Sequence, residues 1–119
     1  MAGKIRQIAI ITLEPERLAK FYEDVFEMTR VPNPGNEAIY LTDGYMNVTL
    51  VPNRAEGKAP GLNHIGIEVS DEAEVARRVT KWGLPAPKGK GGKRANSKNR
   101  ATDPDGNNFN LSEDGFGVR

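Results

Sequence analysis

The chain opens with a strand pattern in which hydrophobic and polar positions alternate. In residues 7–11, Ile8 and Ile10 point to a wholly apolar face, and they alternate with Gln7, Ala9 and Ile11 on the other, mixed face. A period of two predicts a strand with one apolar and one partly polar face. The same pattern returns at residues 62–69, where His64 takes the position of Gln7. The chain therefore contains a duplicated unit, which predicts a ligand site between its two copies.

Each strand pattern is followed by a helix pattern. The first helix starts at Glu14-Pro15, since proline suits the first helical position. The second starts at Asp71, which can cap it, and ends at Gly83. Their apolar stripes, which we expect to be buried against the sheet, are Leu18, Phe21, Tyr22, Val25 and Phe26 in the first helix and Val75, Val79 and Trp82 in the second.

Each copy closes with an Asp-Gly turn and a strand, at residues 43–50 and 105–112, in which Thr49 corresponds to Asn110. Two weaker strand patterns lie between each helix and its closing strand. The sequence thus predicts an α+β domain of two βαβββ modules. The predicted boundaries are 4–52 for module one, 53–61 for the linker and 62–114 for module two.

Composition narrows the class of protein. A chain of 119 residues with 37% hydrophobic and 28% charged residues is typical of one globular domain. The absence of cysteine excludes disulfides and thiolate metal sites. No apolar stretch reaches the ~20 residues that span a membrane, so we expect a cytoplasmic protein. The formal charge of +1 gives no support for nucleic-acid binding.

Basic residues gather in one segment, residues 88–100, which has six of them, several glycines and no acid. Such a segment could hold a phosphate or carboxylate, with Lys93, Arg94 and Arg100 as the expected contacts. It lacks the strand-loop-helix context of a P-loop. It also lacks the interleaved aromatics of single-strand binders, which argues against nucleic acid. A solvated loop is the alternative.

His64 is the single histidine and the candidate catalytic residue. It lies on the mixed face if its isoleucine neighbours face the helix. Glu68 lies on the same face but roughly 13 Å along the strand, too far to share a metal ion with His64. We therefore interpret Glu68 as a pocket or rim residue. A structural role for His64 is the alternative, since a lone histidine is more often structural than catalytic.

Several segments of the two copies form a recognisable set. They are Phe21-Tyr22, Val25-Phe26-Glu27-Met28, Asn63-His64-Ile65-Gly66-Ile67 and Asp103-Pro104-Asp105-Gly106-Asn107. These paired motifs resemble the vicinal oxygen chelate superfamily, which includes glyoxalase I, bleomycin-resistance proteins, extradiol dioxygenases, fosfomycin-resistance proteins and methylmalonyl-CoA epimerase. The resemblance covers nearly the whole chain and implies two βαβββ modules forming paired cupped sheets, commonly in a dimer.

The resemblance also implies four points at which family enzymes hold a divalent metal, here Gln7, Thr49, His64 and Asn110. Glutamine or histidine is accepted at the opening strands, so Gln7 and His64 remain weak metal candidates. Family enzymes have glutamate at the closing strands, where this chain has Thr49 and Asn110. Four neutral donor groups do not offset the positive charge of a divalent cation in a desolvated site. The same four groups suit an organic ligand.

We therefore predict a homodimeric, metal-free small-molecule binding protein of the glyoxalase/bleomycin-resistance type, whose ligand could be anionic. The predicted ligand-binding residues are Gln7, Thr49, His64, Asn110, Glu68 and Arg100. The alternative is a lyase, an isomerase or epimerase, or a dioxygenase, with an atypical site centred on His64. Glu68 or Tyr40 would assist there, and a divalent metal ion could be its cofactor. A third alternative is an interaction protein that uses the basic segment.

Overall fold

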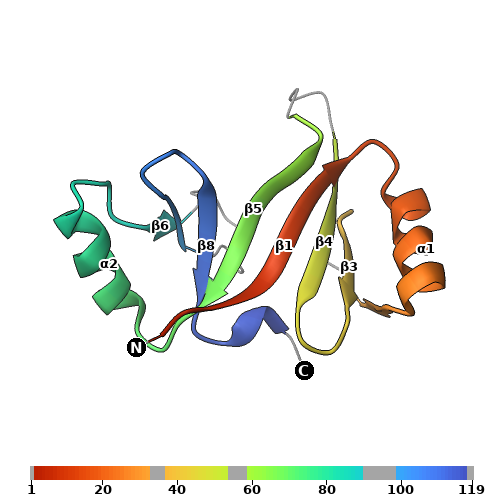
Figure 1. Ribbon diagram of the computed structural model, residues 1–119, viewed down its shortest axis with the longest axis horizontal. Helices are drawn as coiled ribbons and strands as arrows, with labels where there is room; N and C mark the ends of the chain where they lie inside the picture. The colour runs from red at the N-terminus through yellow and green to blue at the C-terminus, as the bar shows by residue number, and fades with distance from the viewer. Residues whose placement is uncertain (1, 33–36, 54–58, 90–98, 118–119) are drawn as a thin grey trace.

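The computed structural model describes residues 2–32, 37–53, 59–89 and 99–117, and these form one mixed sheet with two main helices (Figure 1). The first half contains β1 (Lys4–Thr12), α1 (Pro15–Phe26), β2 (Thr29–Val31), β3 (Ile39–Thr42) and β4 (Asn47–Pro52). The second half contains β5 (Gly61–Glu68), α2 (Glu72–Lys81), β6 (Lys88–Gly89), β7 (Asn99–Thr102) and β8 (Asn108–Ser112). A short 3-10 turn, η1 (Gly115–Gly117), follows. The predicted α+β class and the repeated βαβββ order are confirmed.

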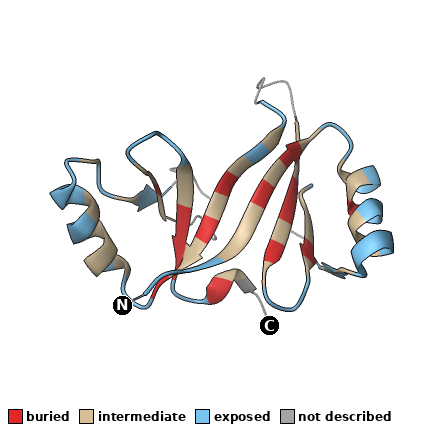
Figure 2. Cartoon of the chain, in the orientation of Figure 1, coloured by how far each residue is buried: buried red, intermediate tan, exposed pale blue. Residues whose placement is uncertain are grey.

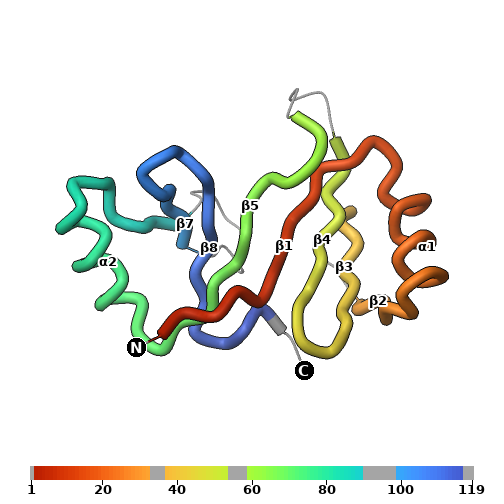
Figure 3. The backbone as a smooth tube through the Cα atoms, viewed as in Figure 1, coloured from red at the N-terminus to blue at the C-terminus, as the bar shows by residue number. Residues whose placement is uncertain are grey.

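The two halves join edge to edge within one chain. The strand order is β2-β3-β4-β1-β5-β8-β7-β6, so β1 and β5 lie at the centre (Figure 3). They run antiparallel, with Ala9 opposite His64 and Gln7 opposite Gly66. Each central strand pairs in parallel with the closing strand of its own half, β1 with β4 and β5 with β8. The predicted linker lies largely outside the described residues.

A cluster of buried hydrophobic residues lies between α1 and strands β3 and β4 of the first half. Ala19, Leu41 and Leu50 are fully buried there. Partly buried residues surround them, namely Ile10, Leu18, Tyr22, Met28, Ile39 and Val48. Since Ile10, Val48 and Leu50 have the same orientation as one another, their sheet face is the one that α1 covers. The alternate positions, which include Gln7 and Thr49, face the other way.

The prediction that both helical stripes are buried is wrong for four side chains. Phe21, Val25 and Phe26 of α1 are 50%, 56% and 60% exposed, and Trp82 is 75% exposed. The reason is that α1 packs through a narrow stripe centred on Ala19, which leaves the neighbouring aromatics on its flank. Trp82 follows the last residue of α2, so it lies beyond the turn that faces the sheet. None of the described α2 residues is fully buried (Figure 2).

The predicted helix signals are confirmed. Pro15 is the first residue of α1. The Asp71 side chain accepts a hydrogen bond from Glu74 N at 3.2 Å and caps α2. Gly83 has a φ of +77°, the left-handed conformation that ends a helix. Among the described residues, no helix is both long and apolar enough to cross a membrane.

The turns before the two closing strands are held by aspartates that do not correspond in sequence. Asp43 Oδ1 accepts from Tyr45 N and Met46 N at 2.8 and 2.7 Å. In the second half the equivalent role belongs to Asp103, which accepts from Asp105 N and Asn107 N at 3.0 and 2.9 Å. The matching Asp-Gly pairs in the sequence therefore conceal a difference in how each turn is stabilised.

Candidate functional site

Polar side chains of both halves share the sheet face that the helices leave uncovered. The register places Asn47 beside Gln7 and Thr49 beside Ala9 in the first half. In the second half Asn108 lies beside His64 and Asn110 beside Gly66. Because Ala9 lies opposite His64, these positions continue across the central β1–β5 pair. We call this surface the polar face: Gln7, Asn47, Thr49, His64, Asn108 and Asn110, with Tyr40 and Arg100 on its outer strands.

The centre of the polar face is buried although the two helices lie at the far ends of the molecule (Figures 1 and 2). Asn47, Thr49 and Asn110 are 3%, 6% and 6% exposed, and His64 is 9% exposed. Buried polar groups cost free energy unless they make hydrogen bonds, so their partners define what the face can do. The four predicted points fall into two hydrogen-bonded groups, one in each half.

In the first half, Gln7 and Thr49 bond to one another. Gln7 Nε2 donates to Thr49 Oγ1 at 2.7 Å. The Gln7 carbonyl lies over Gly66 of the neighbouring half, because a Cβ atom built on Gly66 would come within 2.8 Å of Gln7 Oε1. Gln7 thus spans the boundary between the halves.

In the second half, Arg100 joins His64 to Asn110. Arg100 Nε donates to Asn110 Oδ1 at 2.7 Å, and a terminal guanidinium nitrogen lies 3.1 Å from His64 Nδ1. Arg100 lies in β7 opposite Asn110, so it belongs to a strand and not to the predicted loop. Burial lowers the pKa of the Arg100 guanidinium below its usual value, but an arginine remains charged at physiological pH. A partly desolvated positive charge therefore lies at the polar face.

His64 Nδ1 has two alternative partners. Besides Arg100, Asn63 Oδ1 lies 2.8 Å from it. An unprotonated Nδ1 accepts from Arg100, whereas a protonated Nδ1 donates to Asn63 Oδ1. The two bonds require different states of the ring. When another group binds the Arg100 guanidinium, Nδ1 no longer has to accept from it. Nδ1 can then carry the proton and donate to Asn63 Oδ1.

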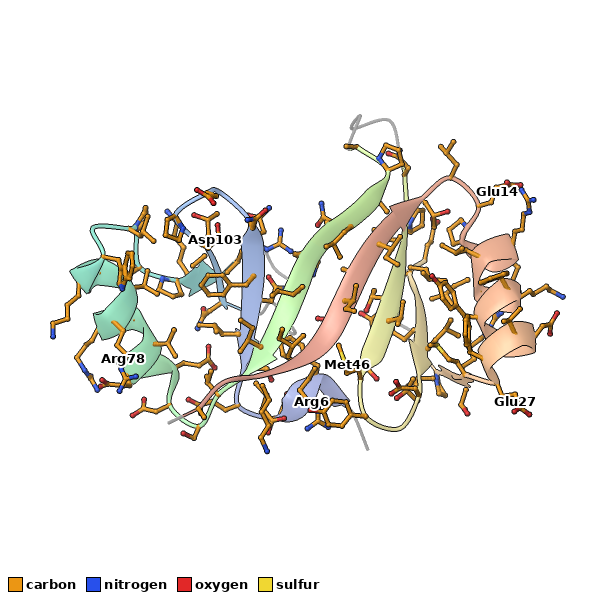
Figure 4. All side chains as sticks on the ribbon, viewed as in Figure 1. Arg6, Glu14, Glu27, Met46, Arg78 and Asp103 are labelled. Carbon is orange, nitrogen blue, oxygen red and sulfur yellow. The ribbon has the colours of Figure 1, made fainter. Side chains whose placement is uncertain are left out.

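Glu68 and Tyr40 lie at the margins of this arrangement. Glu68 is bound by Arg6, whose terminal nitrogen lies 3.2 Å from Glu68 Oε1. The Arg6 guanidinium also lies 5.1 Å from the centre of the Tyr45 ring, near the C-terminal turn at the lower edge of the sheet in Figure 4. Tyr40 pairs with Thr49 on the outer side of the first half. The structure thus places Arg6, Glu68 and Tyr45 together at one end of the face.

Sequence comparison and shape agree on the family. The sequence profile of the glyoxalase-like domain matches residues 7–112. The chain belongs to this family. This family match, together with the fold, confirms the predicted resemblance to the glyoxalase/bleomycin-resistance/dioxygenase, or vicinal oxygen chelate, superfamily. The sequence matches no curated protein significantly.

Several solved structures share the fold at low sequence identity. Methylmalonyl-CoA epimerase from Mycobacterium tuberculosis is 17% identical with a TM-score of 0.69, over 90% of this chain and 85% of that one. The Mn(II)-bound glyoxalase from Novosphingobium aromaticivorans is 22% identical with a TM-score of 0.70, over 92% of this chain and 38% of that one. A glyoxalase/bleomycin resistance protein/dioxygenase superfamily member from Vibrio splendidus is 18% identical with a TM-score of 0.64, over 92% of this chain and 97% of that one. At these identities the likeness establishes the fold alone.

The donor groups of this glyoxalase-like domain do not fit a divalent metal ion. Arg100 places a positive charge against His64 and Asn110, two of the four points, and this charge repels a metal cation. Gln7 and Thr49 are bonded to each other and contribute no negative charge. The described residues contain no group of three histidine, cysteine or acidic side chains that could hold a metal. The face is instead suited to neutral and anionic organic groups.

The structure places one of the three expected contacts of the basic segment and adds one residue that the sequence did not predict. Residues 90–98, including Lys93 and Arg94, lie outside the described residues, so only Arg100 is placed. The added residue is Phe116 in η1, which reaches the polar face from the C-terminal end. Its one sequence signal is an aromatic residue flanked by two glycines, Gly115-Phe116-Gly117.

Proposed function

We propose that this glyoxalase-like domain binds a small organic anion on the polar face, with Arg100 as the anchor and without a metal ion. The observation that carries the proposal is the position of Arg100, a partly buried cation bonded to Asn110 and His64. Within the described residues its hydrogen bonds go to neutral side chains and to no carboxylate. A desolvated cation is stabilised by an anion close to it.

The neighbouring residues supply the remaining recognition. Nε of Arg100 is committed to Asn110, which fixes the plane of the guanidinium. An oxyanion that accepts from the terminal nitrogens competes with His64 Nδ1, and the ring can then donate to Asn63. Gln7 and Thr49 face the same space from the first half and offer amide and hydroxyl groups to a polar substituent. Glu68 is bound by Arg6, so we assign it a supporting role.

Matched pairs of charged and neutral probes test this function. Benzoate and phenyl phosphate would be compared with benzamide by calorimetric titration of the wild-type protein and the Arg100→Met variant. We expect both anions to bind the wild type, and Arg100→Met to weaken them by ~10-fold or more, as for a lost charge-assisted bond. Arg78→Met is the control, because Arg78 is exposed on α2 and pairs with Glu74. Equal affinities for Arg100→Met and wild type would contradict the proposal, as would equal binding of benzamide.

We propose further that the protein is a homodimer and that a second copy covers the exposed flank of α1. The support is a cluster of aromatic rings on α1. The ring centres of Phe21 and Tyr22 lie 5.3 Å apart in an edge-on arrangement, and those of Tyr22 and Phe26 lie 6.1 Å apart in a stacked one. Phe21, Val25 and Phe26 are each at least half exposed. Exposed aromatic groups of this kind are typical of interface anchors, and a patch on one helix can pair with itself about a two-fold axis.

An enzyme centred on His64 is the second candidate. The fold likeness to proteins named as epimerase and glyoxalase favours it, as does the buried position of His64 beside a cation that could stabilise a developing oxyanion. The test is turnover of glutathione hemithioacetals, methylmalonyl-CoA epimers and catechols, with and without added divalent metals. A rate abolished by His64→Ala would replace the binding function with an enzymatic one. Unchanged ligands in every assay would support binding.

A further inference from the structure

The C-terminal turn crosses from the second half of the molecule to the first. After β8, η1 lies against the lower ends of β1 and β5 (Figure 1). Asn47 of β4 donates from Nδ2 to the Phe116 carbonyl at 2.6 Å. The Phe116 N–H donates to Asp114 Oδ1 at 3.1 Å. The turn is thus fixed from both sides of its central residue.

The ring of Phe116 reaches into the polar face. A Cβ atom built on Gly66 would lie 2.8 Å from the ring tip Cζ and 2.8 Å from Gln7 Cβ. Gly66 pairs with Gln7 on one side and with Asn110 on the other. The ring tip therefore lies over the strand position between Gln7 and Asn110, two of the proposed ligand-binding residues.

The turn holds an unfavourable backbone conformation to keep the ring there. Phe116 has a φ of 61°, a left-handed conformation that is unfavourable for a bulky residue. Asn47, which fixes it, leaves its own Oδ1 buried with no hydrogen-bond partner among the described residues. Such a conformation persists only where the surroundings enforce it, and it is found mainly at functional sites.

Glu68 and Arg6 support the turn from below. A Cβ atom built on Gly115 would lie 2.9 Å from Glu68 Oε1, so the turn passes directly over this carboxylate. The Arg6–Glu68 pair, at 3.2 Å, is itself partly buried. These residues belong to different strands and the turn packs on both, which gives the ring a rigid base.

We propose that Phe116 is a specificity-determining residue: its ring forms one side of the ligand site and limits the size of the group next to the anchored anion. This inference rests on the proposed function for the anchor but concerns a different residue and a different property. The ring offers an apolar surface, so it favours a flat or compact hydrocarbon group beside the oxyanion. Larger groups collide with the ring, because its tip is confined by Gln7 and Gly66.

The experiment measures a ratio of affinities, so it is independent of the absolute strength of binding. Benzoate and 1-naphthoate would be titrated into the wild-type protein and into Phe116→Ala, Phe116→Leu and Asn47→Leu. We expect the wild type to prefer benzoate, and Phe116→Ala to shift the ratio of dissociation constants toward naphthoate by ~10-fold or more, since a single methylene group in a pocket already changes affinity by about that factor. Phe116→Leu keeps part of the side-chain bulk. Asn47→Leu keeps the ring but removes the hydrogen bond to the Phe116 carbonyl. Both variants should therefore give intermediate ratios. Trp82→Ala is the control, because Trp82 follows α2 and is 75% exposed.

The outcomes separate this inference from the proposed function. An unchanged ratio in Phe116→Ala, with binding still dependent on Arg100, overturns the role of the ring and leaves the anion site. A changed ratio without dependence on Arg100 overturns the anion anchor and leaves the role of the ring. Failure of both acids to bind the wild type and Phe116→Ala overturns both. Folding of each variant is checked by thermal melting, and Phe116→Leu serves if Phe116→Ala does not fold.

Discussion

The guanidinium of Arg100 lies 3.1 Å from His64 Nδ1, so the single histidine of the chain faces a fixed positive charge. Asn110, which holds the guanidinium by accepting from Nε, is itself one of the four positions at which the superfamily resemblance implies a metal ligand. A side-chain cation is thus built into the second half of the polar face. Its guanidinium faces the histidine ring, and its charge repels any metal ion brought to this face.

The state of the His64 ring should change when an anion binds. In the free protein we expect Nδ1 to accept from Arg100, and in the presence of saturating benzoate we expect it to carry the proton and donate to Asn63. Nitrogen chemical shifts of the His64 ring, measured with and without benzoate, report which nitrogen is protonated. In Asn63→Ala the change should be smaller, because the acceptor is gone. Identical ring shifts in free and saturated protein would contradict this coupling.

Metal affinity should require removal of Arg100 as well as new carboxylates. The Thr49→Glu/Asn110→Glu variant supplies two anionic oxygens beside His64, but Arg100 would pair with the carboxylate introduced in β8 and compete with the metal. Adding Arg100→Met should then strengthen Zn²⁺ or Ni²⁺ binding by ~10-fold or more over the double variant. Calorimetric titration measures both. Adding Arg78→Met instead is the control and should have no effect. Stoichiometric metal in the unmodified protein would contradict the proposal that the ligand is bound without a metal ion.

The α1 flank should control oligomeric state and have little effect on folding. Phe26 is 60% exposed, so Phe26→Ala should cost only about 1 kcal/mol or less of unfolding free energy in the monomer. In the proposed dimer it should raise the dissociation constant by ~10-fold or more. Sedimentation equilibrium measures the dissociation constant. Trp82→Ala, on the other helix and 75% exposed, is the matched control. A wild type that is monomeric at high concentration would rule out the dimer.

The turn before β4 should contribute to acid sensitivity. Backbone N–H groups of Met46 and Tyr45 hold the pKa of Asp43 below its usual value. A lowered folded-state pKa stabilises the fold at pH values above the unfolded pKa, about 3.9, and this contribution is lost as the pH falls through the folded value. Asp43→Asn should therefore lower stability by about 0.5 kcal/mol at pH 7, since Asp43 is exposed, and by less at about pH 2–3. Urea unfolding at several pH values measures this.

The control for that turn is Asp105→Asn, because the Asp105 carboxylate makes no hydrogen bond within the described residues. We expect the unfolding free energy of this variant to follow the wild type at every pH. A constant difference between Asp43→Asn and wild type across the acid and neutral range would show that the effect is steric.

Local patterns predicted the elements of this fold and the symmetry between its halves. The alternation in residues 5–11 and 62–69 indicated two strands with Gln7 and His64 on the same kind of face. Proline, aspartate and glycine marked the helix ends because each acts through its own backbone or its nearest neighbours. Correspondence between the copies then placed Thr49 and Asn110 on that face, where the structure has them.

Only the tertiary structure decided how much of each helix is buried. The spacing of Phe21 and Phe26 is that of a buried stripe, yet the sheet in front of α1 accommodates Ala19 and Tyr22 and leaves the phenylalanines outside. A helical pattern shows which residues share a face, but the width of the contact depends on the partner surface. A partner surface assembled from separate strands leaves no signal within the helix.

The sequence by itself determined the repeated βαβββ order and the polar positions of its strands, because these follow from periods of two and 3.6 along the chain. The tertiary structure decided that Arg100 lies against His64 and that Phe116 lies over Gly66. Both contacts join residues that are far apart in the sequence and meet only through the register of neighbouring strands and the path of the C-terminal turn. No local periodicity encodes such a meeting, since strand register is fixed by the packing of the whole sheet.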